Sequence, residues 1–233
     1  MNLIGKKISE LSTELEEIVF FLDIDETIGK AISVQQNHVS ESFREELYEE
    51  YPPRYRLINT THLHGSTYSF SYYKKWLSKW SQVDVTFRFR ESFDELIDFF
   101  VVNNISEVYF LSAATEEYIE AIQYIVRSEY GFYVKGYVSV CESEQRNILV
   151  DSKVVLYMEK DMERAMDVLL VDSGKTPVLL DDRAYWAKNG YVVPIRPFQP
   201  PNCFADRVSI FLDTPIEDSK APLFILYEEP EID

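Results

Sequence analysis

The stretch Val19-Phe20-Phe21-Leu22-Asp23-Ile24-Asp25-Glu26-Thr27 determines how the rest of the chain is arranged. Four apolar residues lead directly into Asp23 and Asp25, which are separated by a single residue. An apolar run of this length between polar residues is typical of a strand buried on both faces, in the middle of a parallel α/β sheet. The two carboxylates then lie at the carboxyl end of that strand, the edge at which open α/β sheets bind their ligands.

Asp23 and Asp25 have the spacing that phosphoryl transfer needs. Both can reach one metal ion, or one can attack phosphorus while the other handles a proton. Transfer of a phosphoryl group to a carboxylate requires a nucleophilic carboxylate, a hard cation that neutralises the phosphate, and a second acid/base group. The stretch therefore indicates phosphoryl-transfer chemistry.

A second apolar strand, at residues 108–111, ends in Ser112 and is followed by a helix from about Glu116 to Ser128. A hydroxyl in this position can bind a phosphoryl group together with the amides of the following helix. It can also act only as the N-cap of that helix, which is common after a βα turn. We expect the first role for Ser112, because an acid-bearing strand precedes it in the chain.

A further apolar strand, at residues 176–180, ends in the neighbouring acids Asp181 and Asp182. Two adjacent carboxylates at a strand end repel each other unless a cation joins them. A set of ligands that consists of oxygen atoms alone indicates Mg²⁺ rather than zinc.

The cation that would neutralise a bound phosphate has three candidates, Lys153, Lys160 and Lys175. A compact ammonium group can neutralise the phosphate and the attacking carboxylate together. Lys160 lies between the strand expected at residues 154–157 and a helix expected from Glu163 to Val171, and the choice among the three lysines follows from the family resemblance given below.

The segment Asp23-Ile24-Asp25-Glu26-Thr27 resembles the first motif of the haloacid dehalogenase-like (HAD) superfamily. Ser112, Lys160-Asp161-Met162 and Asp181-Asp182 resemble its second, third and fourth motifs, in the order of the family. Arg90 before a helix, and Arg196-Pro197-Phe198 after the last strand, resemble the FCP/SCP (NLI-interacting-factor-like) branch, although the Pro-Gly of that branch's arginine turn is missing here.

The resemblance implies an aspartate-based, Mg²⁺-dependent phosphatase, a phosphoric monoester hydrolase that forms an aspartyl-phosphate intermediate. Asp23 would be the nucleophile and Asp25 the general acid and base, while Thr27 supports the loop. Ser112 and Lys160 would hold the phosphate. The metal ligands would be Asp23, Asp25, Asp181 and Asp182.

The implied fold is a single α/β domain over residues 1–233, a HAD-like Rossmannoid three-layer sandwich with a mainly parallel sheet. Residues 30–82 do not fit the α/β alternation and are expected to form an inserted cap or substrate segment. The alternation returns at Val83, with a strand to Phe89 and a helix from Phe93 in which Ser92 and Glu95 form a capping box.

Aromatic residues are dense within the insertion, from Tyr68 to Trp80. Alternating Tyr and Phe side chains are typical of a half-buried strand that packs on the domain. They could instead line a deep pocket that holds a phosphotyrosine ring by stacking. The branch itself favours phosphoserine and phosphothreonine, so the sequence leaves the phosphorylated residue open, with a preference for phosphotyrosine.

The formal net charge of −17 argues against nucleic acid as a partner, because like charges repel. Cys141 and Cys203 do not make a disulfide framework, and no apolar stretch is long enough to span a membrane. We therefore expect an intracellular, cytoplasmic protein. The resemblance to the FCP/SCP branch implies that its partner is a phosphorylated protein or peptide. The alternatives are a small-metabolite phosphatase and a non-catalytic phosphopeptide-binding module.

Overall fold

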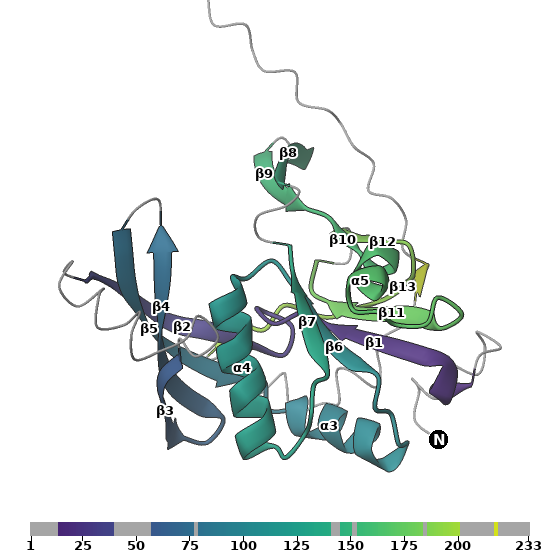
Figure 1. The fold of residues 1–233 in the computed structure, drawn as a ribbon, viewed down its shortest axis with the longest axis horizontal. Coiled ribbons are helices and arrows are strands. Elements are labelled where there is room, and N and C mark those ends of the chain that lie inside the picture. The colour runs from purple at the N-terminus through teal and green to yellow at the C-terminus, as the bar shows by residue number, and fades with distance from the viewer. Residues whose placement is uncertain are drawn as a thin grey trace, which may run out of the picture.

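A mainly parallel sheet of six strands forms the centre of the computed structural model, in the order β14-β13-β11-β1-β6-β7 (Figure 1). Only β14 is antiparallel to its neighbour. The structure describes residues 14–39, 57–76, 79–140, 145–150, 153–183, 186–200 and 217–218. The strands are β1 (Ile18–Leu22), β6 (Val108–Ser112), β7 (Gly136–Ser139), β11 (Thr176–Asp181), β13 (Tyr191–Pro194) and β14 (Glu217–Asp218).

Strand β1 is buried on both faces, as the apolar run predicts. Its side chains alternate between two apolar clusters, with Phe20 in one and Phe21 in the other. Helices α3 (Phe93–Val102) and α4 (Glu116–Glu129) pack into the cluster of Phe20, and α5 (Met162–Val168) packs into that of Phe21. Helices therefore cover the two faces of the sheet, and the mixed α/β fold with a mainly parallel sheet is confirmed.

A second, antiparallel sheet of four strands lies beside α4, in the order β2-β5-β4-β3 (Figure 1). Its strands are β2 (Gly29–His38), β3 (Leu57–His64), β4 (Thr67–Trp76) and β5 (Lys79–Phe89). The strand predicted from Val83 to Phe89 and the helix predicted from Phe93 are present as β5 and α3, but residues 83–89 pair with β2 and β4 instead of entering the central sheet. The sheet thus extends on both sides of the predicted insertion at 30–82.

The aromatic side chains of β4 are packed inside the molecule. Tyr68, Phe70, Tyr72 and Tyr73 are 7%, 1%, 6% and 7% exposed. The rings of Phe70 and Tyr72 lie 5.7 and 6.4 Å from the ring of Tyr118 on α4. The packing interpretation therefore accounts for these aromatic residues, whereas the side chains of Trp76 and Trp80 lie outside the described part of the structure.

The strand predicted at residues 154–157 is present as β9 (Lys153–Met158), but it pairs with β8 (Gln145–Val150) in a separate antiparallel hairpin and not with the central sheet. The central sheet takes β7 as its edge strand, which was not predicted because its four residues are half-buried and contain no apolar run. Ser92 is the N-cap residue of α3, as predicted, but its buried hydroxyl makes no capping hydrogen bond.

Short elements complete the described chain. A 3₁₀ helix, η1 (Leu15–Glu17), precedes β1, and β10 (Lys160–Asp161) forms a parallel pair with β12 (Ala187–Lys188). Among the described residues, no helix is both long and apolar enough to cross a membrane.

Candidate active site

Three carboxylates converge where β1 and β11 end. Asp23 follows β1, Asp181 is the last residue of β11, and Asp182 is next in the chain. The parallel pairing brings them together, since the amide of Asp23 donates to the carbonyl oxygen of Leu180 at 2.9 Å. One oxygen from each of the three carboxylates lies within 4.8 Å of the others. The predicted first and fourth motifs thus meet at one site.

Lys160 lies between two of these acids. Its Nζ atom is 2.8 Å from Oδ1 of Asp23 and 2.6 Å from Oδ2 of Asp181, and its side chain is 1% exposed. Burial alone would lower the pKa of Lys160, but the charges of Asp181 and Asp23 outweigh burial and raise it. Lys160 therefore stays charged and can neutralise an anion next to Asp23.

The two other candidate lysines are not brought to this site by any described contact. Lys175, before the start of β11, lies 3.8 Å from Glu107. The side chain of Lys153 is outside the described part of the structure. Among the candidates, Lys160 has the geometry expected of the phosphate-binding lysine.

The pKa values of the two other acids in the cluster, Asp181 and Asp182, are raised. Burial raises the pKa of Asp181 more than the nearby Lys160 ammonium lowers it. Burial, together with the charges of Asp23 and Asp181, also raises the pKa of Asp182. A hard cation bound by these oxygens would relieve the repulsion, and Mg²⁺ prefers carboxylate oxygens of this kind. The donor set therefore fits Mg²⁺.

Thr27 joins the two loops that carry the acids. Its hydroxyl oxygen accepts the amide N–H of Asp182 at 2.9 Å. The same oxygen lies 3.2 Å from Oδ1 of Asp182 and 3.5 Å from Oδ2 of Asp23. Because Thr27 is fully buried, these contacts fix the spacing of the two loops, which agrees with its predicted supporting role.

Asp25 is not among the three residues whose carboxylate oxygens lie within 4.8 Å of one another. Its Oδ1 atom accepts a hydrogen bond from the phenol of Tyr118 at 2.8 Å. Burial, together with the charge of Asp23, raises the pKa of Asp25 to about 6. A carboxyl with this pKa can release and accept a proton near neutral pH, so the geometry favours the acid/base role over the predicted metal-ligand role.

Ser112 ends β6 beside β1, and its side chain is buried. Its Oγ atom accepts the amide N–H of Ala114 at 3.3 Å. The N-cap of α4 is Thr115, so Ser112 does not cap the helix. The hydroxyl instead lies in the turn before the helix, which is consistent with the phosphate-binding role.

Arg90 supports the loop of the first motif, a role that the sequence analysis did not assign. Its side chain is 1% exposed and donates to three carbonyl oxygens: Thr27 at 2.9 Å, Glu26 at 2.8 Å and Arg196 at 2.5 Å. Glu26 has a φ of 62°, a left-handed conformation that disfavours side chains with a Cβ. The buried guanidinium therefore holds a strained turn between Asp25 and Thr27.

We expect Arg90→Gln to lower the free energy of unfolding by about 3–5 kcal/mol, because three carbonyl groups lose a charged, buried donor. Urea denaturation at fixed pH measures the change. Arg88→Gln is the control, since Arg88 lies on β5 two residues before Arg90, is 27% exposed, and reaches Glu91 only at 3.5 Å. Equal effects of the two substitutions would contradict the supporting role of Arg90.

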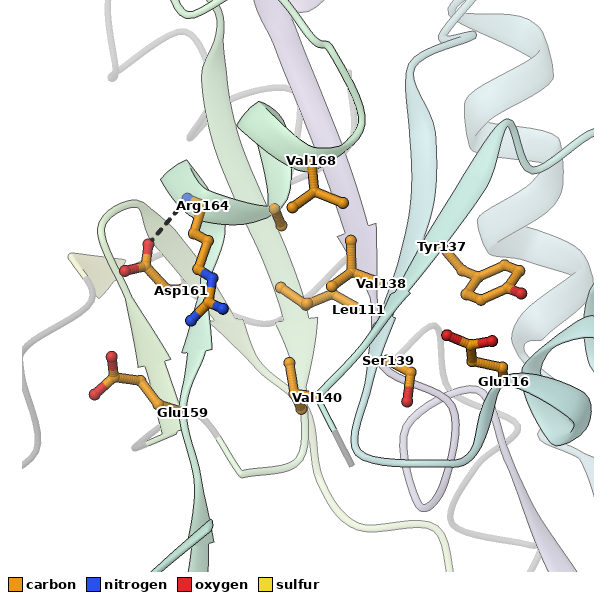
Figure 2. A pocket seen from close by; sticks show the side chains of 11 residues that line it. Leu111, Glu116, Tyr137, Val138, Ser139, Val140, Glu159, Asp161, Arg164 and Val168 are labelled. Atoms are coloured by element: carbon orange, nitrogen blue, oxygen red, sulfur yellow. Dashed lines mark hydrogen bonds between the residues drawn. The ribbon is translucent and has the colours of Figure 1, made fainter. Parts of the chain in front are cut away.

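A cavity of about 260 Å³ lies between β7 and α5, and Figure 2 shows its apolar wall of Leu111, Val138, Val140 and Val168. None of the candidate catalytic residues lines it. Its lining instead includes their neighbours in the chain: Leu111 precedes Ser112, and Glu159 and Asp161 flank Lys160. Because neighbouring residues of a strand point to opposite sides, this cavity is distinct from the acid cluster.

No protein-family model and no curated protein sequence matches the chain. Among solved structures, it is similar to the RNA polymerase II CTD phosphatase Fcp1 of fission yeast, solved bound to beryllium fluoride. The two are 14% identical with a TM-score of 0.41, over 84% of this chain and 45% of that chain. The chain thus spans less than half the length of that phosphatase, and a similarity at this level does not establish a family.

Proposed function

We propose that the protein is a Mg²⁺-dependent, aspartate-based phosphatase of the HAD superfamily that acts on phosphorylated proteins. The observation that supports this most is the position of Lys160, between Asp23 and Asp181 at 2.8 and 2.6 Å. A nucleophilic carboxylate, a buried ammonium and further metal-binding carboxylates then share one edge of the sheet. This is the set that transfer of a phosphoryl group to a carboxylate requires.

In the proposed reaction, a carboxylate oxygen of Asp23 attacks phosphorus, and the bond between phosphorus and the leaving oxygen breaks. Asp25 gives its proton to that oxygen. Asp25 then takes a proton from a water molecule that attacks the aspartyl phosphate, which releases inorganic phosphate and restores Asp23. Lys160 and Ser112 hold the phosphoryl oxygens. Mg²⁺, when bound by Asp23, Asp181 and Asp182, would supply charge neutralisation of the phosphate.

The kind of phosphorylated residue that the protein prefers is a separate question. A preference for phosphotyrosine stays a prediction. The aromatic side chains that suggested it offer less support, because Tyr68, Phe70, Tyr72 and Tyr73 of β4 are buried. Phosphoserine and phosphothreonine therefore remain the alternatives that the resemblance to the FCP/SCP branch suggests.

Matched peptides that differ only in phosphotyrosine or phosphoserine test this point, with kcat/KM measured in Mg²⁺. We expect a ratio above one in favour of phosphotyrosine. A ratio at or below one would contradict that preference while leaving the phosphatase proposal intact. Hydrolysis of small phosphate esters with no peptide hydrolysis would favour a metabolite phosphatase, and binding of phosphopeptides without any hydrolysis would favour a non-catalytic module.

A further inference from the structure

Tyr118 connects the candidate general acid to the second sheet. It lies near the start of α4, is 7% exposed, and donates its phenol hydrogen to Oδ1 of Asp25 at 2.8 Å. Burial, together with the charge of Asp25, raises the pKa of Tyr118 well above its usual value. The phenol therefore keeps its proton and remains a donor to Asp25.

Three aromatic rings of the second sheet surround the Tyr118 ring. The ring of Phe70 lies 5.7 Å from it, that of Phe87 6.2 Å, and that of Tyr72 6.4 Å. Phe70 and Phe87 are 1% and 0% exposed, so these rings cannot move without opening the core. Contacts of this kind restrict a side chain to one orientation. Strands β4 and β5 thereby fix the direction of the Tyr118 hydroxyl.

Asp25 needs such a restraint. The charge of Asp23 repels its carboxylate more strongly than the charge of Lys160 attracts it, so an unrestrained Asp25 side chain would turn away from Asp23. A hydrogen bond from Tyr118 opposes that movement. A carboxyl group retains an acceptor oxygen when it is protonated, so the same bond can persist whether Asp25 acts as acid or as base.

We propose that Tyr118 is a positioning residue that orients Asp25 for proton transfer, and that the antiparallel sheet β2-β5-β4-β3 supports catalysis by holding Tyr118. This inference rests on the proposed phosphatase function. In this proposal the buried aromatic residues of β4 and β5 hold Tyr118 in place and do not contact a substrate ring.

The test uses Tyr118→Phe, which removes the hydroxyl and keeps the ring. kcat/KM is measured for aryl phosphates whose leaving groups differ in basicity. Phenolate resembles a tyrosine side chain, with a pKa of about 10, and needs a proton to leave. p-Nitrophenolate is a much weaker base and leaves without one. Since general acid catalysis contributes about 10²–10⁴-fold, we expect a loss of about 10-fold or more for phenyl phosphate and less than about threefold for p-nitrophenyl phosphate.

Tyr137→Phe is the matched control. Like Tyr118, Tyr137 donates its phenol hydrogen to a carboxylate at 2.8 Å. Its acceptor is Glu120 of α4. This variant should leave both rates within about twofold of wild type, as expected of a hydrogen bond remote from the reacting groups. Phe70→Leu should shift the two rates in the same direction as Tyr118→Phe, by a smaller factor, because it loosens the packing without touching Asp25.

A double-mutant comparison separates positioning from a general structural effect. In an Asp25→Asn background, Tyr118→Phe should cause no further loss for phenyl phosphate, because the two residues act as one unit. Equal losses for both substrates in Tyr118→Phe, or a loss that persists in the Asp25→Asn background, would overturn the positioning role. A wild-type protein that hydrolyses neither these aryl phosphates nor the phosphopeptides would overturn the proposed function itself, and that outcome is recognised before any variant is made.

Discussion

Asp23→Asn should lower the turnover of p-nitrophenyl phosphate by about 10⁴-fold or more, because the amide cannot attack phosphorus. The loss should appear in kcat, measured by steady-state release of p-nitrophenolate in Mg²⁺. The fold should survive, since Lys160 keeps its 2.6 Å contact with Asp181 after the charge of Asp23 is removed. We therefore expect that the reaction requires Asp23, whereas folding does not.

The control for this variant is Asp172→Asn, at an exposed carboxylate whose Oδ1 accepts only the nearby amide of Gly174 among the described contacts. It should retain full activity. Circular dichroism and urea denaturation show whether Asp23→Asn folds as the wild type does. Activity of Asp23→Asn within tenfold of wild type, in a properly folded protein, would contradict the nucleophilic role.

Removal of divalent metal should have the second large effect, a loss of activity by about 10²–10³-fold or more, corresponding to several kcal/mol of charge stabilisation. Added Mg²⁺ should restore the rate. The reason is that Asp23, Asp181 and Asp182 place oxygens within 4.8 Å of one another, which favours a shared cation. Full activity in excess chelator would be incompatible with this site.

The same acids predict how pH changes the effect of the metal. The pKa is raised from 3.8 to about 6 for Asp181 and to about 7 for Asp182. The folded state therefore binds these protons more tightly than the unfolded state, and the metal-free protein loses stability as pH rises through that range. The increase in Tm on adding Mg²⁺ should be larger near pH 8 than near pH 5, where protons occupy the same oxygens. Thermal denaturation at the two pH values, with and without Mg²⁺, measures the difference, and an equal increase would contradict the assignment.

The convergence of the site could be predicted from the sequence because it follows from strand order. Apolar runs identify β1, β6 and β11, and the carboxyl ends of parallel strands share one edge of a sheet. Asp23, Ser112 and Asp181 each end or follow one of these strands. The apolar runs and the polar residues that follow them are visible in the sequence, so the proximity of these side chains could be predicted.

The position of β5 could not be predicted in this way. The alternation of Val85, Phe87 and Phe89 correctly indicates a strand with one buried face. The same alternation fits either sheet, because pairing partners are not encoded in a single strand. β7 was missed for a different reason, since a short strand at a sheet edge has neither an apolar run nor a clear alternation.

The roles of Arg90 and Tyr118 depend on contacts between distant segments. Arg90 reaches carbonyl oxygens that lie 63 to 106 residues away in the chain, at Thr27 and Arg196. Tyr118 is 93 residues from Asp25. An arginine is most often a surface residue, and a tyrosine is intermediate between buried and exposed, so neither residue type indicates these positions by itself. Only the folded arrangement shows that these two side chains are buried and directed at the site.

The central claim is that the phosphoryl group of a substrate is transferred to Asp23. The most direct measurement is an acid quench of the Asp25→Asn variant during turnover of p-nitrophenyl phosphate, followed by peptide mapping of the phosphorylated residue. This variant lacks the base that releases phosphate, so the intermediate should accumulate. We expect a hydroxylamine-sensitive acyl phosphate on Asp23. A phosphoryl group on any other residue, or none while p-nitrophenolate is released in a burst, would contradict the transfer to Asp23.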